Sequence, residues 1–268
     1  MKKFKISQIQ FEAKSTPLKN AKILYNYFSK TKNFKPDLIC TPECSNIITN
    51  DKKFLLENTN FEFECPILKM AKNYANINKV NINIGSLLLK QKNSKKLVNR
   101  SLFINKSGII IKKYDKIHMF DVNINHRETH RESYTFKAGK KIEYLNLNNI
   151  KIGLTICYDL RFPLLYRTLA KKGTHIILVP AAFTVPSGKA HWEILLRSRA
   201  IENSLFIVAT NMCGTHHSNR KTYGNSMLVN PWGEVKSRAK SKQTILNSVI
   251  DLDEIIKFRK KIPAILTD

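Results

Sequence analysis

The chain has 268 residues, 43% of them hydrophobic, which is enough to bury the core of one or two globular domains. Its 46 lysines and arginines outnumber its 20 aspartates and glutamates, and the formal net charge is +26. The basic residues are scattered and no basic run is interleaved with aromatic residues, so we expect lysine-decorated solvent faces rather than a nucleic-acid or membrane partner.

The first half of the chain alternates between strand and helix patterns. Residues 4–11 alternate in side-chain polarity, which predicts a strand. Residues 16–28 and 66–74 are expected to be helices, because each pattern opens with proline and continues with apolar residues at helical spacing. Further strands are expected at residues 36–40, 81–89, 98–104 and 109–113, with a hairpin turn over residues 105–108.

The second half continues this alternation after a long polar stretch. Residues 117–140 have no apolar pattern and are expected to form a loop, and loops of this length are usually functional or disordered. A buried strand, a helix capped by Asp159 and ended by Gly173, and a second buried strand are expected next. These two strands are expected at residues 151–156 and 175–179. The remaining expected elements are strands at residues 205–211, 225–229 and 244–250, and helices at residues 190–203 and from 251 onward. The pattern predicts one α/β domain over residues 1–268.

Cys157 directly follows the strand expected at residues 151–156. Ligands bind at the carboxyl ends of strands in open α/β sheets, so a cysteine there is a candidate nucleophile. The nearby helix N-terminus would favour its thiolate form. A small buried cysteine without a function fits this stretch equally well.

Two charged residues also follow expected strands. Glu43 comes after Pro42, and burial there would raise the pKa of its carboxyl group, which suits a general base near neutrality. Lys116 could stabilise an oxyanion. Taken singly, each is more often a surface charge. Together with Cys157, however, they place an acid, an ammonium and a thiol at three strand ends, as in catalytic sites at one edge of a sheet.

The histidines are weaker candidates. His126 and His130 superficially resemble a zinc-binding helix, but the glutamate between them stands in the wrong place and no apolar periodicity predicts a helix. His216 and His217 lie in a loop that contains glycine and asparagine, and we expect them to be solvated. We therefore predict no metal site.

Five blocks of the sequence resemble the nitrilase (carbon–nitrogen hydrolase) superfamily. Three of them contain Glu43, Lys116 and Cys157. The blocks that resemble its catalytic motifs are residues 41–43, 114–121 and 153–163, and further matches lie at residues 190–202 and 223–234. The resemblance covers nearly the whole chain. Residues 190–193 and 213–217 look most like the deaminated-glutathione amidases, with the ω-amidases close behind.

The resemblance implies a fold and a set of roles. The fold would be a four-layer α-β-β-α sandwich. Glu43 would be the base and Cys157 the nucleophile, while Lys116 and the backbone N–H of Tyr158 would stabilise the oxyanion. A second, supporting glutamate would be Glu132, which is followed by serine and then by alanine and glycine where the family has proline and glycine; Glu128 is the weaker candidate.

Two further positions are assigned by the resemblance to substrate binding. Arg161 is similar to a residue that grips a substrate carboxylate, although a salt bridge that only shapes the loop is the alternative. Ser187 stands where the family has a threonine. Asn225 replaces a common histidine, and we assign it no role.

The implied function is hydrolysis of the C–N bond of a small linear amide bearing a carboxylate, like deaminated glutathione, with a cysteine thioester and release of ammonia. No cofactor is implied, and a homodimer is expected. The alternatives are an ω-amidase, a nitrile or N-carbamoyl hydrolase, and a basic nucleic-acid-binding protein on the same scaffold.

The N-terminal sequence, the lengths of the apolar runs and the cysteines indicate the cellular compartment of the protein. The N-terminus has no uninterrupted apolar segment of a signal peptide, and the chain has no apolar run of 18 residues. The five cysteines contain no C-x-x-C pair, which favours reduced thiols. We therefore expect a cytoplasmic protein.

Overall fold

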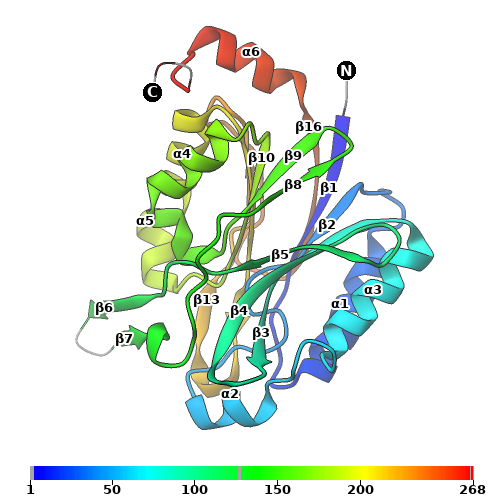
Figure 1. Cartoon of the computed structure of the whole chain (residues 1–268), viewed down its shortest axis with the longest axis vertical. Helices are drawn as coiled ribbons and strands as arrows, with labels where there is room; N and C mark the ends of the chain where they lie inside the picture. Colours follow the sequence, from blue (N-terminus) through cyan, green and yellow to red (C-terminus); the bar gives the residue numbers. More distant parts are fainter. Residues whose placement is uncertain (1–2, 126–127, 266, 268) are drawn as a thin grey trace.

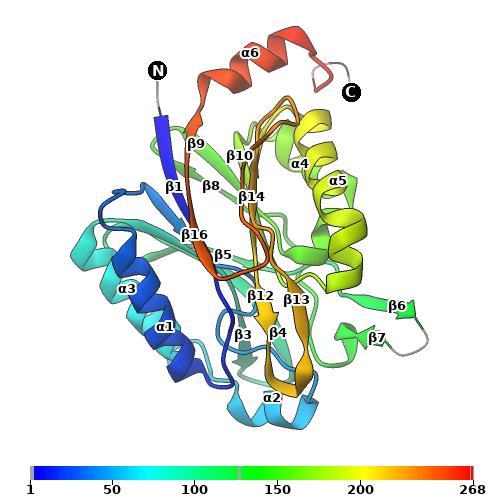
Figure 2. The ribbon, with the colours of Figure 1, turned by 180° about the vertical axis from the view of Figure 1, so that it is seen from behind.

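Two six-stranded sheets lie between two pairs of helices (Figures 1 and 2). This computed structural model describes residues 3–125, 128–265 and 267. One helical layer consists of α1 (Pro17–Lys30) and α3 (Pro66–Asn78), and the other of α4 (Pro163–Lys171) and α5 (Val185–Asn203). The expected four-layer α-β-β-α sandwich is confirmed.

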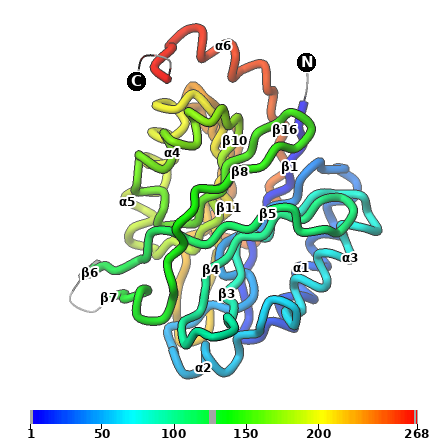
Figure 3. The backbone as a smooth tube through the Cα atoms, in the orientation of Figure 1, coloured from blue at the N-terminus to red at the C-terminus, as the bar shows by residue number. Residues whose placement is uncertain are grey.

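The first sheet contains strands from both ends of the chain. Its order is β16 (Thr244–Asp251), β1 (Lys3–Gln10), β2 (Leu38–Cys40), β3 (Asn81–Gln91), β4 (Ser94–Ile104) and β5 (Ile110–Asp115). Strand β1 pairs antiparallel with β16, so segments far apart in the sequence lie side by side (Figure 3). Strands β1, β2 and β3 are parallel, and β4 and β5 form the expected hairpin.

The second sheet carries the nucleophile. Its order is β15 (Val235–Arg238), β14 (Met227–Val229), β11 (Phe206–Asn211), β10 (Ile176–Ala181), β9 (Ile150–Leu154) and β8 (Tyr144–Leu147). Strands β9, β10 and β11 are parallel and are connected by α4 and α5. Their carboxyl ends therefore lie at the same edge of the sheet.

The alternation along β1 explains how the sheets pack. Phe4 and Ile6 belong to the apolar cluster that includes the space between the sheets and continues beneath α4 and α5, whereas Ile9 and Phe11 belong to the cluster beneath α1 and α3. Since successive side chains point to opposite faces, one strand contributes to both apolar layers. The amide of Gln8, also between the sheets, donates a 2.8 Å hydrogen bond to the Ala209 carbonyl and ties them together.

Several element predictions need correction. The stretch expected to be a loop contains β6 (Asp121–Asn125), β7 (Glu128–Arg131) and a 3₁₀ turn, Glu132–Tyr134. The two strands form a separate polar hairpin in which none of the side chains whose burial is described is fully buried, so the sequence shows no apolar periodicity. Helix α5 begins five residues earlier than expected, because Thr184 caps it and proline follows within the first turn. The terminal helix is present as α6 (Asp253–Lys261), and the elements that the sequence patterns missed are α2 (Lys52–Asn58), β8, β12 (Cys213–Thr215), β13 (Lys221–Tyr223) and β15.

Candidate active site

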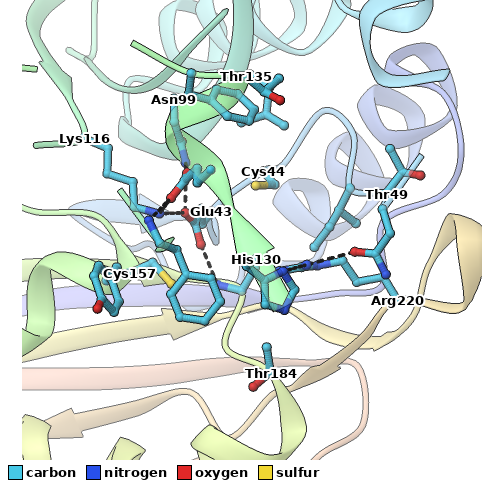
Figure 4. Close-up of a pocket in the computed structure, with 18 of the residues that line it drawn as sticks. Glu43, Cys44, Thr49, Asn99, Lys116, His130, Thr135, Cys157, Thr184 and Arg220 are labelled. Atoms are coloured by element: carbon cyan, nitrogen blue, oxygen red, sulfur yellow. Dashed lines mark hydrogen bonds and ion pairs between the residues drawn. The ribbon is translucent and has the colours of Figure 1, made fainter. Parts of the chain in front are cut away.

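The three predicted catalytic side chains meet between the two sheets (Figure 4). Glu43 follows β2 and Lys116 follows β5 in the first sheet, whereas Cys157 follows β9 in the second. The Lys116 Nζ lies 3.0 Å from Glu43 Oε1. The expectation that these groups share the edge of one sheet is wrong, because face-to-face packing brings the strand ends of two sheets together.

Glu132 is the second carboxylate at Lys116. Its Oε1 and Oε2 lie 3.0 and 2.8 Å from the lysine Nζ, and Oε2 also accepts a 2.6 Å hydrogen bond from the Phe120 N–H. The Asn99 amide donates to Glu43 at 2.9 Å and to Glu132 at 3.4 Å. Sequence analysis missed Asn99, because no pattern distinguishes it from Arg100 and Ser101, its polar neighbours in β4.

Gly139 fixes the backbone of the lysine. Its N–H donates a 2.8 Å hydrogen bond to the Lys116 carbonyl. A Cβ at this position would lie 2.1 Å from the Asp115 carbonyl oxygen, so no side chain fits. The loop therefore closes on the lysine although alanine precedes the glycine where the family has proline.

Burial and mutual charge determine how the three groups ionise. Burial alone would raise the pKa of Glu43, but the Lys116 ammonium and hydrogen bonds to the carboxylate lower it below its ordinary value. Burial likewise opposes the charge on Lys116, yet Glu132, Glu43 and Cys157 hold the pKa of that ammonium well above its usual range. The predicted rise for Glu43 is wrong, because the sequence did not show how closely the lysine approaches.

Cys157 is a neutral thiol at rest. Burial raises its pKa well above the ordinary value and Glu43 adds to the rise, while Lys116 opposes it. The expected helix N-terminus is not at Cys157, because α4 begins only at Pro163. A thiol held this way needs a base to take its proton, and the adjacent Glu43 carboxylate is unprotonated because of its lowered pKa.

The turn that carries Cys157 is strained and is held by a buried carboxylate. Cys157 has a φ of +49°, in the left-handed region that non-glycine residues rarely adopt. Asp159 accepts a 2.8 Å hydrogen bond from the Ile156 N–H and bonds from Tyr114 and His118. Asp159 does not cap α4 as predicted, because that helix begins at Pro163 and the aspartate lies within the 3₁₀ turn Cys157–Arg161.

A cavity of about 420 Å³ opens onto the thiol. Arg161 lines it, with Nη2 3.2 Å from His191 Nδ1 and the guanidinium 5.8 Å from the ring centres of Tyr158 and Phe183. No carboxylate in the described part of the chain pairs with Arg161, so the alternative of a salt bridge that only shapes the loop is not observed.

Ser187 and Arg220 also line the cavity. The Ser187 hydroxyl is 2.8 Å from that of Thr184, and both belong to the first turn of α5. Arg220, which follows the 3₁₀ turn His217–Asn219 between β12 and β13, was missed by sequence analysis, since no pattern distinguishes it from the other basic residues.

Other predicted positions lie outside the cavity or cannot be placed. Asn225 is not among the residues that line it; its side chain bonds the Tyr223 carbonyl. His126 lies outside the described residues, and the side chain of Glu128 is likewise not described. The expectation that His216 is solvated is wrong: it is 7% exposed, and its ring nitrogens contact the Ala13 carbonyl and the Thr222 hydroxyl.

Within residues 3–125 and 128–265, no cluster of three or more histidine, cysteine, aspartate or glutamate side chains has a metal-binding arrangement. None of the helices in these ranges combines the length and apolar character needed to cross a bilayer.

The chain is similar to known proteins along almost its whole length. A family model described as carbon-nitrogen hydrolase matches residues 5–260. A deaminated glutathione amidase of Dictyostelium discoideum is 36% identical over 237 residues, covering 85% of this chain and 81% of the relative. Omega-amidase NIT2 of Homo sapiens is 29% identical, covering 98% and 94%. The crystal structure of the C. elegans NitFhit protein matches with a TM-score of 0.92 at 29% identity, over 99% of this chain but 65% of that one.

Proposed function

The chain belongs to the carbon–nitrogen hydrolase family, and we propose that it is an amidase that hydrolyses the C–N bond of a small linear amide bearing a carboxylate. The observation that carries this proposal is the contact of one buried lysine with two carboxylates beside a buried thiol. The names of the relatives, deaminated glutathione amidase and omega-amidase, support the choice of an amide substrate.

The proposed reaction begins with proton transfer from Cys157 to Glu43. The resulting thiolate attacks the amide carbonyl, and the negative charge that develops on the carbonyl oxygen is stabilised by the Lys116 ammonium and the Tyr158 N–H. Because Lys116 is already charged and fixed by two carboxylates, no reorganisation is needed as this charge appears.

Collapse of the tetrahedral species breaks the C–N bond. Glu43 returns its proton to the leaving nitrogen, and the acyl group remains on Cys157 as a thioester. Glu43 then takes a proton from water, and the hydroxide attacks the thioester. Collapse of this second tetrahedral species breaks the C–S bond, Glu43 gives its proton back to the sulfur, and the carboxylic acid leaves. Ammonia is the product when the substrate is a primary amide, and no cofactor takes part in these steps.

The substrate carboxylate is assigned to Arg161, with Ser187 beside it in the cavity. A guanidinium presents a planar pair of donors that matches a carboxylate. The contacts of Arg161 with two aromatic rings and an imidazole hold its side chain without cancelling its charge.

The test is incubation with ω-amides, nitriles and N-carbamoyl compounds, followed by ammonia measurement and mass spectrometry of the protein. We expect turnover of carboxylate-bearing amides and an acyl adduct on Cys157. Cys157→Ala is expected to abolish turnover while the circular dichroism spectrum is retained. Full activity of this variant would remove the mechanism, and preferential turnover of nitriles or carbamoyl compounds would select the alternative reactions. Steeply salt-dependent binding of DNA or RNA without turnover would favour the nucleic-acid alternative.

We also propose that one domain spans residues 1–268, and that the enzyme is a homodimer in the cytoplasm. The outer helices α4 and α5 expose Leu164, Ile194 and Ile201, which suits an apolar interface between two copies. All five cysteines are free thiols, as suits a reducing compartment. Light scattering tests the oligomeric state, and fractionation of cells tests the location.

A further inference from the structure

Asn99, on β4, contacts all three charged residues that surround the nucleophile. Its Nδ2 donates to Glu43 Oε1 at 2.9 Å and to Glu132 Oε1 at 3.4 Å. Its backbone carbonyl accepts a 3.0 Å hydrogen bond from the Lys116 N–H. The residue is 2% exposed, so bulk water does not compete for these contacts. The base, the lysine and the second glutamate are therefore all held by one asparagine.

The side-chain amide of Asn99 can face the two carboxylates in only one orientation. An ionised carboxylate accepts hydrogen bonds and donates none, so the NH₂ end of the amide must point toward Glu43 and Glu132 and the carbonyl end away from them. Nothing in the described part of the chain donates to the buried Asn99 Oδ1. The carboxylates, rather than a partner of Oδ1, therefore set the orientation, and an acceptor is left unused so that the donors stay on the two glutamates.

The two oxygens of the Glu43 carboxylate have different surroundings. Oε1 accepts hydrogen bonds from the Asn99 amide at 2.9 Å and from Lys116 Nζ at 3.0 Å (Figure 4). Because a carboxylate oxygen offers two lone-pair positions, Oε1 is fully occupied. Oε2 accepts a 2.9 Å hydrogen bond from the Ala182 N–H, and among the described residues no further N–H or O–H donates to it. Only Oε2 therefore has a position left for an incoming proton.

The thiol lies on the Oε2 side of the carboxylate. The Ala182 N–H that donates to Glu43 Oε2 also acts on the Cys157 sulfur, where it lowers the pKa of the thiol. The sulfur and Oε2 therefore lie beside the same donor. A hydrogen bond from the Cys157 thiol in turn lowers the pKa of Glu43. Since Oε1 has no position left, we assign this bond, and the proton that it carries, to Oε2.

We propose that Asn99 is a positioning residue that directs the proton of Cys157 to Oε2 of Glu43, because Asn99 and Lys116 together close Oε1. In this step the S–H bond breaks, its electron pair stays on the sulfur, and an O–H bond forms at Oε2. The proton is then held on the side of the carboxylate that faces the sulfur, where the leaving nitrogen takes it up. This inference deepens the proposed amidase function and rests on the roles that it gives to Glu43 and Cys157.

Two substitutions of Asn99 test this role by kinetics on glutaramic acid, an ω-amide with a carboxylate. Asn99→Ser removes the amide donor. We expect kcat to fall about tenfold or more while KM changes by less than about threefold. The acidic limb of kcat/KM should move up by about one pH unit, because Glu43 loses a hydrogen bond that favours its charged form. Asn99→Asp keeps the size of the side chain but places a carboxylate against Oε1, where the two would share a proton, so both effects should be larger.

Asn83→Ser is the matched control for loss of a buried amide. Asn83 lies on the neighbouring strand β3, is 1% exposed, and donates a 3.1 Å hydrogen bond to the Ser101 hydroxyl, away from the cavity. Its loss of stability in urea should be similar to that of Asn99→Ser, while its acidic limb stays in place. An acidic limb that does not move in Asn99→Ser, an equal shift in Asn83→Ser, or wild-type kinetics in Asn99→Asp would overturn the proposal.

Alkylation of Cys157 by iodoacetamide keeps this inference distinct from the amidase function. A C–S bond forms, iodide leaves and the thiol proton passes to Glu43, so the rate depends on the proton route but not on amide turnover. Mass spectrometry of the Cys157 peptide should show alkylation at neutral pH about tenfold slower in Asn99→Ser than in the wild-type protein and in Asn83→Ser.

The two measurements together decide between the proposals. If no amide is hydrolysed but alkylation depends on Asn99 in this way, the proposed function fails and the proton route stands. If amides are hydrolysed and neither the alkylation rate nor the acidic limb depends on Asn99, the function stands and the proton route fails.

Discussion

The Tyr114 hydroxyl donates a 2.7 Å hydrogen bond to the Asp159 carboxylate. Tyr114 lies two residues before Lys116 on β5, and Asp159 lies two residues after Cys157. Both partners are buried, with exposures of 1% and 0%. One hydrogen bond thus joins the strand that positions the lysine to the turn that positions the nucleophile, across the interface between the two sheets.

Tyr114→Phe should therefore impair catalysis more than folding. Loss of the bond lets the strained Cys157 turn move relative to Lys116, and misplacement by about 1 Å can cost up to about a hundredfold in rate. We expect kcat to fall by about tenfold or more with a stability loss of about 1 kcal/mol. Steady-state kinetics and urea denaturation measure the two effects.

The matched control is Tyr74→Phe. It removes an equally short bond, 2.7 Å to the Phe28 carbonyl, from a buried tyrosine far from the cavity. Its stability loss should be similar and its kcat unchanged. Equal kinetics in both variants would show that the Tyr114 bond does not position the site.

Glu132→Gln should move the alkaline limb of the pH–activity profile to lower pH. Glu132 is the strongest of the charges that raise the pKa of Lys116 above 10.5, so its loss lowers that pKa. The stability contributed by this raised pKa is fully present below pH 10.5 and is lost as the pH rises through the folded-state value, so the variant should also unfold at lower alkaline pH.

We expect kcat/KM of Glu132→Gln to fall roughly a hundredfold at neutral pH, because the lysine is less firmly held. Glu62→Gln is the control: it removes the same charge from a half-buried surface cluster with Arg100 and Lys113. An alkaline limb that stays in place in Glu132→Gln would contradict the assigned role of this glutamate.

Arg161→Gln should reduce selectivity rather than abolish turnover. Substrates whose acyl half carries a carboxylate should lose about tenfold to a hundredfold in kcat/KM, since a charge-assisted contact is removed, whereas neutral amides should react as in the wild-type protein. Arg197→Gln, on the half-exposed face of α5, is the control. Equal rates of the wild-type protein on acidic and neutral amides would exclude a carboxylate subsite at Arg161.

His216 should make the protein lose stability in mild acid. Burial lowers the pKa of its imidazole from 6.5 to about 4, so the unfolded chain binds a proton that the folded chain does not. Stability from this residue is therefore full above pH 6.5 and falls as the pH drops toward 4, by at most about 3 kcal/mol. Urea denaturation at pH 7.5 and 4.5 should show a smaller loss for His216→Gln; an identical loss would contradict a neutral, buried imidazole.

Some features of this protein could be predicted from the sequence because they depend only on residues that are close together in the chain. The periods of the longer buried strands, the prolines that open α1 and α3 and the turn of the β4–β5 hairpin depend on neighbours in the chain, and these were predicted. The motifs around Glu43, Lys116 and Cys157 are long enough to reveal the family, and with it the four layers. Residues such as Asn99 and Arg220 lie outside these motifs and carry no local signal.

What the sequence by itself determined is therefore most of the strands and helices of the sandwich, the family and the identity of the acid, the ammonium and the thiol. Only the tertiary structure decided their ionisation, because pKa values depend on burial and on charges a few ångströms away that come from other sheets. It also decided the role of Asp159, which holds the nucleophile turn rather than a helix. These properties arise from distances between segments far apart in the chain, and a local pattern contains no such distance.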